Sequence, residues 1–226
     1  EVKAIALRTL AWFKPVMAHY REEIETFANF PTMFMGLVGP DDTLEFYDGR
    51  LCLMGAEGQV VNADIPVDRY GEYIGESVEP WSYLKSPYYR PIGYPAGVYR
   101  VGPLARLNMV SRCGTPLADQ ELAEYKQLST AERMSSFYFH YARLIEILHG
   151  IEKIEQLLSD PDSVSAHVFA SASANSREGV GVSEAPRGTL LHHYRIDENG
   201  LIVWANLIIA TGNNNLAMDR GVLQVA

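Results

Sequence analysis

Residues 183–209 read SEAPRGTLLHHYRIDENGLIVWANLII. Two β-type runs, TLLHHYRI and LIVWANLII, flank the tetrapeptide DENG. An Asn-Gly pair between two such runs is a strong signal for a hairpin turn. We therefore predict strands over residues 179–210, with Asn199 and Gly200 in the turn and the EAPRG stretch ahead of it.

Arg187 stands between Pro186 and Gly188 in this stretch. Proline fixes one backbone torsion and glycine lets another group approach closely, so we predict that Arg187 is held in a defined place. Its planar fork of donors suits a fixed anionic ligand. The alternative is a buried ion pair with Glu184 or a neighbouring carboxylate, and the residues alone leave both readings open.

Four histidines are candidate ligands. His192 and His193 are neighbours in a predicted strand, so they point to opposite faces and at most one can enter a site. His140 and His149 lie in a predicted helix at a spacing that does not place them on one face. We expect packing or hydrogen-bonding roles for all four.

The pattern along the chain predicts an α+β fold with long core helices, a small antiparallel meander and hairpins. We expect one domain over residues 1–226. Pro15 should kink or divide the first helix, and residues 129–160 should form the longest one, capped by Ser129 or Thr130 with Glu132 closing a capping box. The expected segments are a helix over 1–30, a β-meander over 31–66, a Tyr/Pro-rich loop packed against a neighbouring surface over 80–105, helices over 117–160, strands over 179–210, and a last helix with asparagines as caps.

Composition narrows the class of protein. The 226 residues are 47% apolar and 21% charged, with a formal charge of −9, which argues against a nucleic-acid surface. We expect no membrane span and no signal peptide. Cys52 and Cys113 lie far apart in the sequence and are predicted to be structural thiols. Glu1 opens a helical pattern without a cap and the last residues are apolar, so we expect an internal piece of a longer chain, with self-association through uncovered surfaces.

Several longer stretches resemble one family. EAPRGTLLHHY is similar to the Glu-Ala-Pro-Arg-Gly motif of nickel–iron hydrogenase large subunits. The stretches HYREEIETFANFPTMFMGLVGPDD, EPWSYLK, GYPAGVYRVGPLARLN, GTPLAD and NLIIATGNNNLAM resemble the soluble, NAD-reducing (bidirectional) branch. One alternative is the related quinone-site subunit of complex I, which differs after the turn. Another is a non-catalytic interaction module that uses the 80–105 loop as its partner surface.

The resemblance implies a fold and a metal centre. In that family nickel and iron share four cysteines from two CxxC motifs, one near each end, and the iron carries two cyanides and one carbon monoxide. Neither Cys52 nor Cys113 matches those positions, and the family's proton-transfer glutamate near the first CxxC is absent. The chain therefore resembles the central part of the large subunit, and we expect it to bind no cofactor and to be inactive by itself.

The resemblance also implies site residues. Arg187 matches an arginine that lies over the metal pair and donates toward a cyanide. Pro186 matches the proline that lines the diatomic ligands, and Glu184 belongs to the same motif. Thr211 matches a donor to the second cyanide, and Leu207 a position whose backbone carbonyl faces Mg²⁺. His192 aligns with a histidine common in the family.

The implied reaction is heterolytic cleavage of H₂, with reversible H₂ oxidation coupled to NAD(H). The expected partners are a small subunit with iron–sulfur clusters and diaphorase subunits, in the cytoplasm. The matching arginine of the family has been considered as a base, but a guanidinium is hard to deprotonate. We expect Arg187 to act by electrostatics and positioning.

Overall fold

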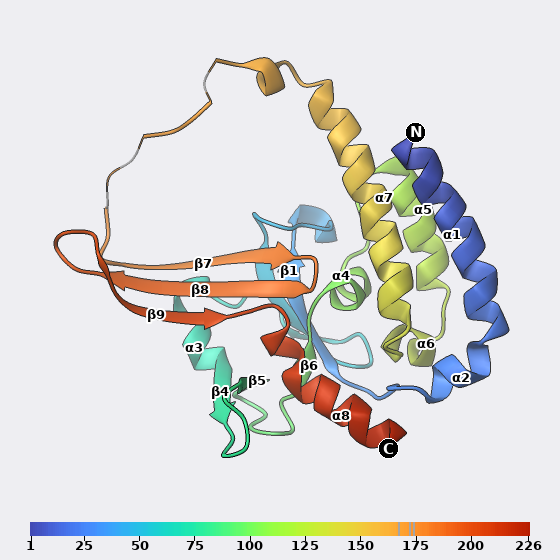
Figure 1. Cartoon of the computed structure of the whole chain (residues 1–226), viewed down its shortest axis with the longest axis horizontal. Coiled ribbons are helices and arrows are strands. Elements are labelled where there is room, and N and C mark those ends of the chain that lie inside the picture. The colour runs from blue at the N-terminus through green and yellow to red at the C-terminus, as the bar shows by residue number, and fades with distance from the viewer. Residues whose placement is uncertain (167, 172, 174) are drawn as a thin grey trace.

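The computed structural model describes residues 1–166, 168–171, 173 and 175–226. It has a layer of helices on one side and three small sheets on the other (Figure 1). The predicted α+β class is confirmed. The helices are α1 (Val2–His19), α2 (Arg21–Thr26), α3 (Tyr70–Tyr73), α4 (Pro103–Met109), α5 (Pro116–Lys126), α6 (Thr130–Met134), α7 (Tyr138–Leu158) and α8 (Asn215–Val225). Among the described residues, none of these helices is long and apolar enough to span a membrane.

The first predicted helix is two helices, and the break falls at Tyr20 instead of Pro15. Tyr20 leaves the helical region with φ −99° and ψ 27°. Proline removes one hydrogen bond from a helix interior. Burial of Leu10 and Met17, on either side of Pro15, holds α1 against the helical layer.

The predicted helix over 129–160 is also divided. The capping box between Ser129 and Glu132 is present, but it opens the short α6, and α7 starts afresh at Tyr138. Between them, Ser135 is extended and its hydroxyl donates to the Ile24 carbonyl at 3.0 Å. The Ser136 hydroxyl donates to the Ala28 carbonyl at 2.9 Å. These tertiary bonds explain why the chain leaves the helix here.

The strands form three sheets. The orders are β3-β2-β1-β6, β4-β5 and β7-β8-β9. Every pair is antiparallel except β1 and β6. The strands are β1 (Met33–Val38), β2 (Arg50–Met54), β3 (Val60–Asn62), β4 (Ile74–Val78), β5 (Lys85–Tyr89), β6 (Tyr99–Arg100), β7 (Glu178–Ala185), β8 (Gly188–Ile196) and β9 (Ile202–Ile208).

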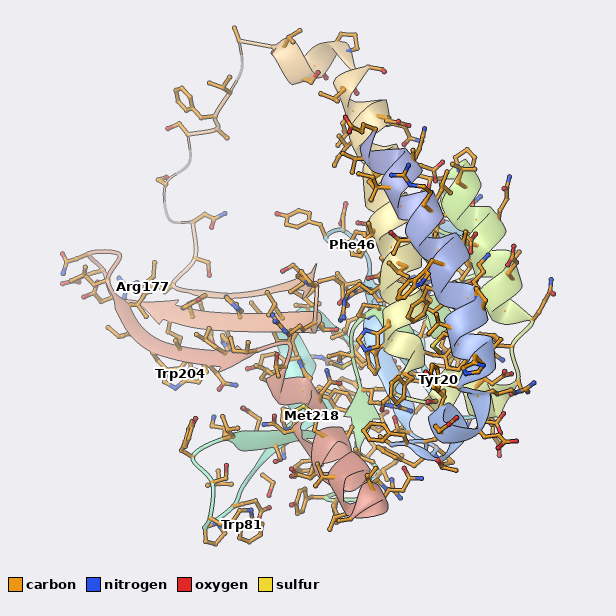
Figure 2. All side chains as sticks on the ribbon, turned by 45° about the vertical axis from the view of Figure 1, so that its right-hand side comes forward. Tyr20, Phe46, Trp81, Arg177, Trp204 and Met218 are labelled. Atoms are coloured by element: carbon orange, nitrogen blue, oxygen red, sulfur yellow. The ribbon has the colours of Figure 1, made fainter. Side chains whose placement is uncertain are left out.

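The predicted loop over 80–105 contains more regular structure than expected. It supplies β5 and β6 and the start of α4. Pro87 is tolerated in β5 because that strand has a neighbour on only one side. Part of the loop does not pack against a surface: Trp81 is 79% exposed and Tyr83 is 97% exposed. In Figure 2 Trp81 lies at the far end of the β4–β5 hairpin, away from the helical layer.

Strand β1 separates two hydrophobic cores. All six of its residues are buried. Phe34 and Val38 face a core shared with α1, α4, α5 and α7, whereas Met35 and Leu37 face a core shared with β8 and β9. Alternate residues of a strand point to opposite faces, so this one strand joins the helical layer to the sheet that carries the EAPRG stretch.

Candidate functional site

Pro186 and Arg187 form the tight turn between β7 and β8. The two strands pair without interruption from Glu178 opposite Arg195 to Ala185 opposite Gly188. Gly188 has φ +134°, and a Cβ there would lie 2.1 Å from a methyl group of Val101. The prediction that another group approaches closely at Gly188 is therefore confirmed, and no other residue type fits this backbone. The predicted hairpin between β8 and β9 is confirmed too, with Gly200 at φ +80° in its turn.

A buried charge network lies beneath this turn. Arg106 of α4, 1% exposed, donates to Glu184 at 2.5 Å and makes two bonds to Glu146 of α7, at 2.6 and 2.7 Å. The same guanidinium reaches the Ala185 carbonyl at 3.2 Å. Glu184 also accepts from the Leu37 amide at 2.9 Å. Because Glu184 pairs with Arg106, the alternative that Arg187 forms a buried ion pair with Glu184 is wrong.

Electrostatics bind this network tightly. Burial alone would lower the pKa of Arg106, but the ion pairs with Glu146 and Glu184 overcome this and raise it. Burial raises the pKa of Glu184, against the opposing pull of Arg106. Removing one partner of such a buried pair leaves an uncompensated charge. Glu184 is thus a structural support for the turn that carries Arg187.

Consecutive asparagines after β9 tie Arg187 to Thr211. The Asn214 side chain donates to the Arg187 carbonyl at 3.5 Å and accepts from the Val101 amide at 2.9 Å. The backbone N–H of Asn214 donates to the Thr211 carbonyl at 2.9 Å. Asn213, fully buried, donates to the Thr189 carbonyl at 2.8 Å and accepts from the Tyr99 hydroxyl at 2.6 Å.

Their predicted role as helix caps is wrong, because no side-chain cap bond opens α8. The predicted helix itself is confirmed. In place of capping, the asparagine side chains cross-link the turn, β6 and the entrance of α8.

Arg187 and Thr211 line the same cleft, of about 810 Å³. Its walls come from β6, α7, α8, the turn before β8, the segment after β9 and residues after α2, and Figure 2 labels Met218 on the α8 wall. Among the described residues, neither the Arg187 guanidinium nor the Thr211 hydroxyl has a hydrogen-bond partner. The lining residues are Phe27, Ala28, Arg100, Ser136, Phe139, Arg143, Arg187, Thr211, Asn214, Ala217, Met218, Gly221, Val222, Val225 and Ala226.

Two further predicted site residues lie elsewhere. Pro186 lines a second cleft of about 420 Å³, together with Arg106, Glu146 and Glu184. Leu207 lies in β9 opposite His192, is 43% exposed, and does not line either cleft. The turn thus presents its two residues to different clefts, and Arg143 of α7 lines both.

The histidines behave as strand alternation predicts. His193 contacts Glu178 at 2.7 Å and meets the Trp204 ring edge to face, whereas His192 contacts the Tyr194 hydroxyl at 3.1 Å. His149 is buried and bonded to Thr115 at 3.1 Å. His140 is exposed on α7. In the described part of the chain, no group of three His, Cys, Asp or Glu residues is arranged to hold a metal ion.

The cysteines also fit their predicted structural role. Both are buried, and burial raises the pKa of Cys52 to about 11 and that of Cys113 to about 12. Both thiols therefore stay protonated at neutral pH, as expected of cysteines that pack in a core.

The residues that line the cleft could hold the anionic ligands of a metal centre, but they do not supply ligands for the metal ions themselves. Arg187 and Thr211 offer a guanidinium and a hydroxyl without acceptors in the described chain, and such donors suit anionic ligands. The described residues do not offer the thiolate or imidazole set that nickel and iron bind. The arrangement can hold the outer, anionic side of a bound group.

The fold and this cleft define a class. Residues 55–219 match the family model described as nickel-dependent hydrogenase, and the chain belongs to that family. It is 43% identical to the beta subunit of the NAD-reducing hydrogenase HoxS of Cupriavidus necator, over 92% of this chain and 43% of the relative. It is 40% identical to a subunit of the vhu F420-non-reducing hydrogenase of Methanocaldococcus jannaschii, over 94% of this chain and 50% of the relative.

Solved structures agree. An NAD⁺-reducing NiFe hydrogenase in the H₂-reduced state superposes with a TM-score of 0.93 at 34% identity, covering 98% of this chain and 49% of that one. A NiFeSe hydrogenase of Dm. baculatum gives a TM-score of 0.70 at 19% identity, over 95% of this chain and 48% of that one, which shows the shared fold. The predicted family is confirmed over the complex I alternative. The chain spans about half the length of the curated relatives it matches.

Arg100, Arg106 and Asn213 carried no site prediction. The first two lie in GVYRVGPLARLN, where an arginine interrupts each of two apolar runs. Charged residues are almost never fully buried unless they are paired. An arginine inside an apolar run is the signal that could have found Arg100 and Arg106, whereas Asn213 gives no comparable signal.

Proposed function

We propose that this chain is the central part of the catalytic large subunit of a nickel–iron hydrogenase that interconverts H₂ with protons and electrons, coupled to NAD(H) through partner subunits. One observation carries the proposal. Two donors without acceptors in the described chain, Arg187 and Thr211, line a single cleft and are joined through Asn214. The family membership gives those donors a chemical purpose.

The group that fits these donors is a nickel–iron centre with cyanide and carbon monoxide ligands, beside a Mg²⁺ ion. When bound, that centre supplies the chemistry that splits H₂. Arg187 and Thr211 would hydrogen-bond its anionic ligands, and the Leu207 carbonyl would face Mg²⁺. Pro186 lines the second cleft, so it would contribute by shaping the turn that carries Arg187 and not by packing against these ligands. The metal ligands would come from further segments of the large subunit, so we expect the 226 residues alone to show no turnover.

Arg187 acts here as a fixed positive charge. Its backbone is held on three sides: by Gly188 against Val101, by Asn214, and by Arg106 through the Ala185 carbonyl. A donor whose position is fixed in advance stabilises charge without having to reorganise. A guanidinium stays protonated in proteins, so Arg187 would act as a hydrogen-bond donor and not as a base.

The test is Arg187→Lys in the full-length enzyme. Lysine keeps the charge and loses the planar fork, so we expect H₂ turnover to fall by about a hundredfold or more. Nickel content should be retained, because the ligands lie elsewhere. Arg112→Lys, at an exposed pair with Asp41, is the matched control. Turnover equal to wild type in Arg187→Lys would contradict the assignment.

The same proposal extends to partners and compartment. The relatives' names describe subunits of NAD-reducing and F420-non-reducing hydrogenases. We expect the full-length protein to assemble in the cytoplasm with a small subunit that carries iron–sulfur clusters and with diaphorase subunits. Co-purification with a tagged copy of the full-length protein tests this.

A further inference from the structure

Arg100 is a buried cation without a matching anion. It lies in β6, is 2% exposed, and donates to the Phe30 carbonyl at 3.2 Å and the Thr32 hydroxyl at 3.3 Å. Its guanidinium stacks 5.1 Å from the Phe30 ring. These partners are all neutral, and Nη1 has no hydrogen-bond partner among the described residues.

A buried guanidinium without a counter-charge destabilises the folded chain. Burial lowers the pKa of Arg100 to about 10, which still leaves the side chain charged at neutral pH. Buried charges in proteins are paired or bind a ligand, because an isolated one loses its hydration without compensation. Arg106, in the helix that follows β6, has two carboxylates. Arg100 has none.

Arg100 and Arg187 line the same cleft, and a missing anion could reach Arg100 through it. Arg100 lines it together with Arg143 and Arg187, and no acidic side chain lies among its lining residues. The Arg143 side chain also has no ion pair among the described residues. The other walls are largely apolar, with Met218, Val222 and Val225 exposed on α8. A carboxylate on an apolar stem fits the unpaired Arg100 in a cleft with apolar walls.

We propose that Arg100 Nη1 binds a carboxylate on an apolar segment of the same polypeptide, and that this segment fills the part of the cleft between β6 and α8. The occupant rests on the proposed function: the relatives are about twice as long as this chain, so they contain further segments that could supply it. The volume of about 810 Å³ lies in the range of clefts that enclose a sizeable ligand, roughly 300–1,000 Å³. Arg100 is thus a docking residue, separate from the donors Arg187 and Thr211.

The charge preference is testable on the 226-residue chain with benzoate as the probe and benzamide as its neutral counterpart. We expect calorimetric titration to show at least tenfold tighter binding of benzoate. Arg100→Met should abolish that preference, Arg100→Lys should reduce it, and the exposed Arg112→Met should leave it unchanged. Equal binding of the two probes, or a preference that survives in Arg100→Met, would overturn the site.

The identity of the occupant is tested in a longer protein of the relatives' length. There we expect benzoate not to bind, because the segment already fills the cleft. Arg100→Met should lower the Tm of the longer protein and should raise or not change the Tm of the 226-residue chain. Benzoate binding to the longer protein would reject the segment in favour of a free carboxylate. No readout requires metal or H₂, so this result stands apart from the hydrogenase assignment.

Discussion

The two clefts on either side of the EAPRG turn treat charge in opposite ways. In the cleft that Pro186 lines, the buried Arg106 is matched by Glu146 and Glu184. In the cleft that Arg187 lines, three arginines meet no acidic side chain. A cation satisfied within the chain serves the fold, whereas a cation without a partner indicates a ligand from outside. Arginine therefore has two roles around this one turn, and the presence or absence of a carboxylate partner distinguishes them.

The largest effect is expected when the ion pairs of Arg106 are broken. Arg106→Met leaves Glu146 and Glu184 buried without their counter-charge, so we expect the free energy of unfolding to fall by about 3–5 kcal/mol. Urea denaturation of the 226-residue chain measures it. The exposed pair of Arg112 and Asp41 is the control, and Arg112→Met should cost no more than about 1 kcal/mol. Equal losses in the two variants would mean that the buried network is not a special support of the turn.

A smaller effect is expected at the turn itself. In Gly188→Ala the new methyl group would lie 2.1 Å from a Val101 methyl, on a backbone with φ +134°. Overpacking of this kind costs about 1–3 kcal/mol, and the left-handed backbone adds strain. Gly181→Ala, in the same hairpin, has open space around its Cβ position and is the matched control. If both variants were equally stable, the close approach of Val101 to the turn would not constrain Arg187.

The sequence predicts this fold well where local patterns decide it. The Asn-Gly turn between β8 and β9, the capping box at Ser129 and the class of the fold are all present. Predictions failed where tertiary contacts override the pattern. Ser135 and Ser136 end a helical pattern by bonding to residues after α2, and β6 is held by a parallel partner far away in sequence. Such bonds leave no local signal.

The site shows the same division. Alternation and the Pro-Arg-Gly geometry predicted the opposite faces of His192 and His193 and the close packing at Gly188. The ion-pair alternative failed because the partner of Glu184 is Arg106 of helix α4, far away in sequence, and a short-range pattern does not place Arg106 beside β7. The prediction that the asparagines cap the last helix failed for a related reason. An amide side chain can cap a helix or cross-link strands, and only the packed structure selects between these uses.

The smallest effect is expected at Arg187, whose guanidinium has no ion pair within the described chain. The Arg187 side chain is exposed and its guanidinium has no bond within the described chain, so Arg187→Met should change the free energy of unfolding by no more than about 0.5 kcal/mol. The turn should survive, since Gly188, Asn214 and Arg106 hold its backbone and not its guanidinium. Urea denaturation beside Arg106→Met gives the comparison. A loss near that of Arg106→Met would show that Arg187 already has a structural partner, and its freedom to bind an external anion would be lost with it.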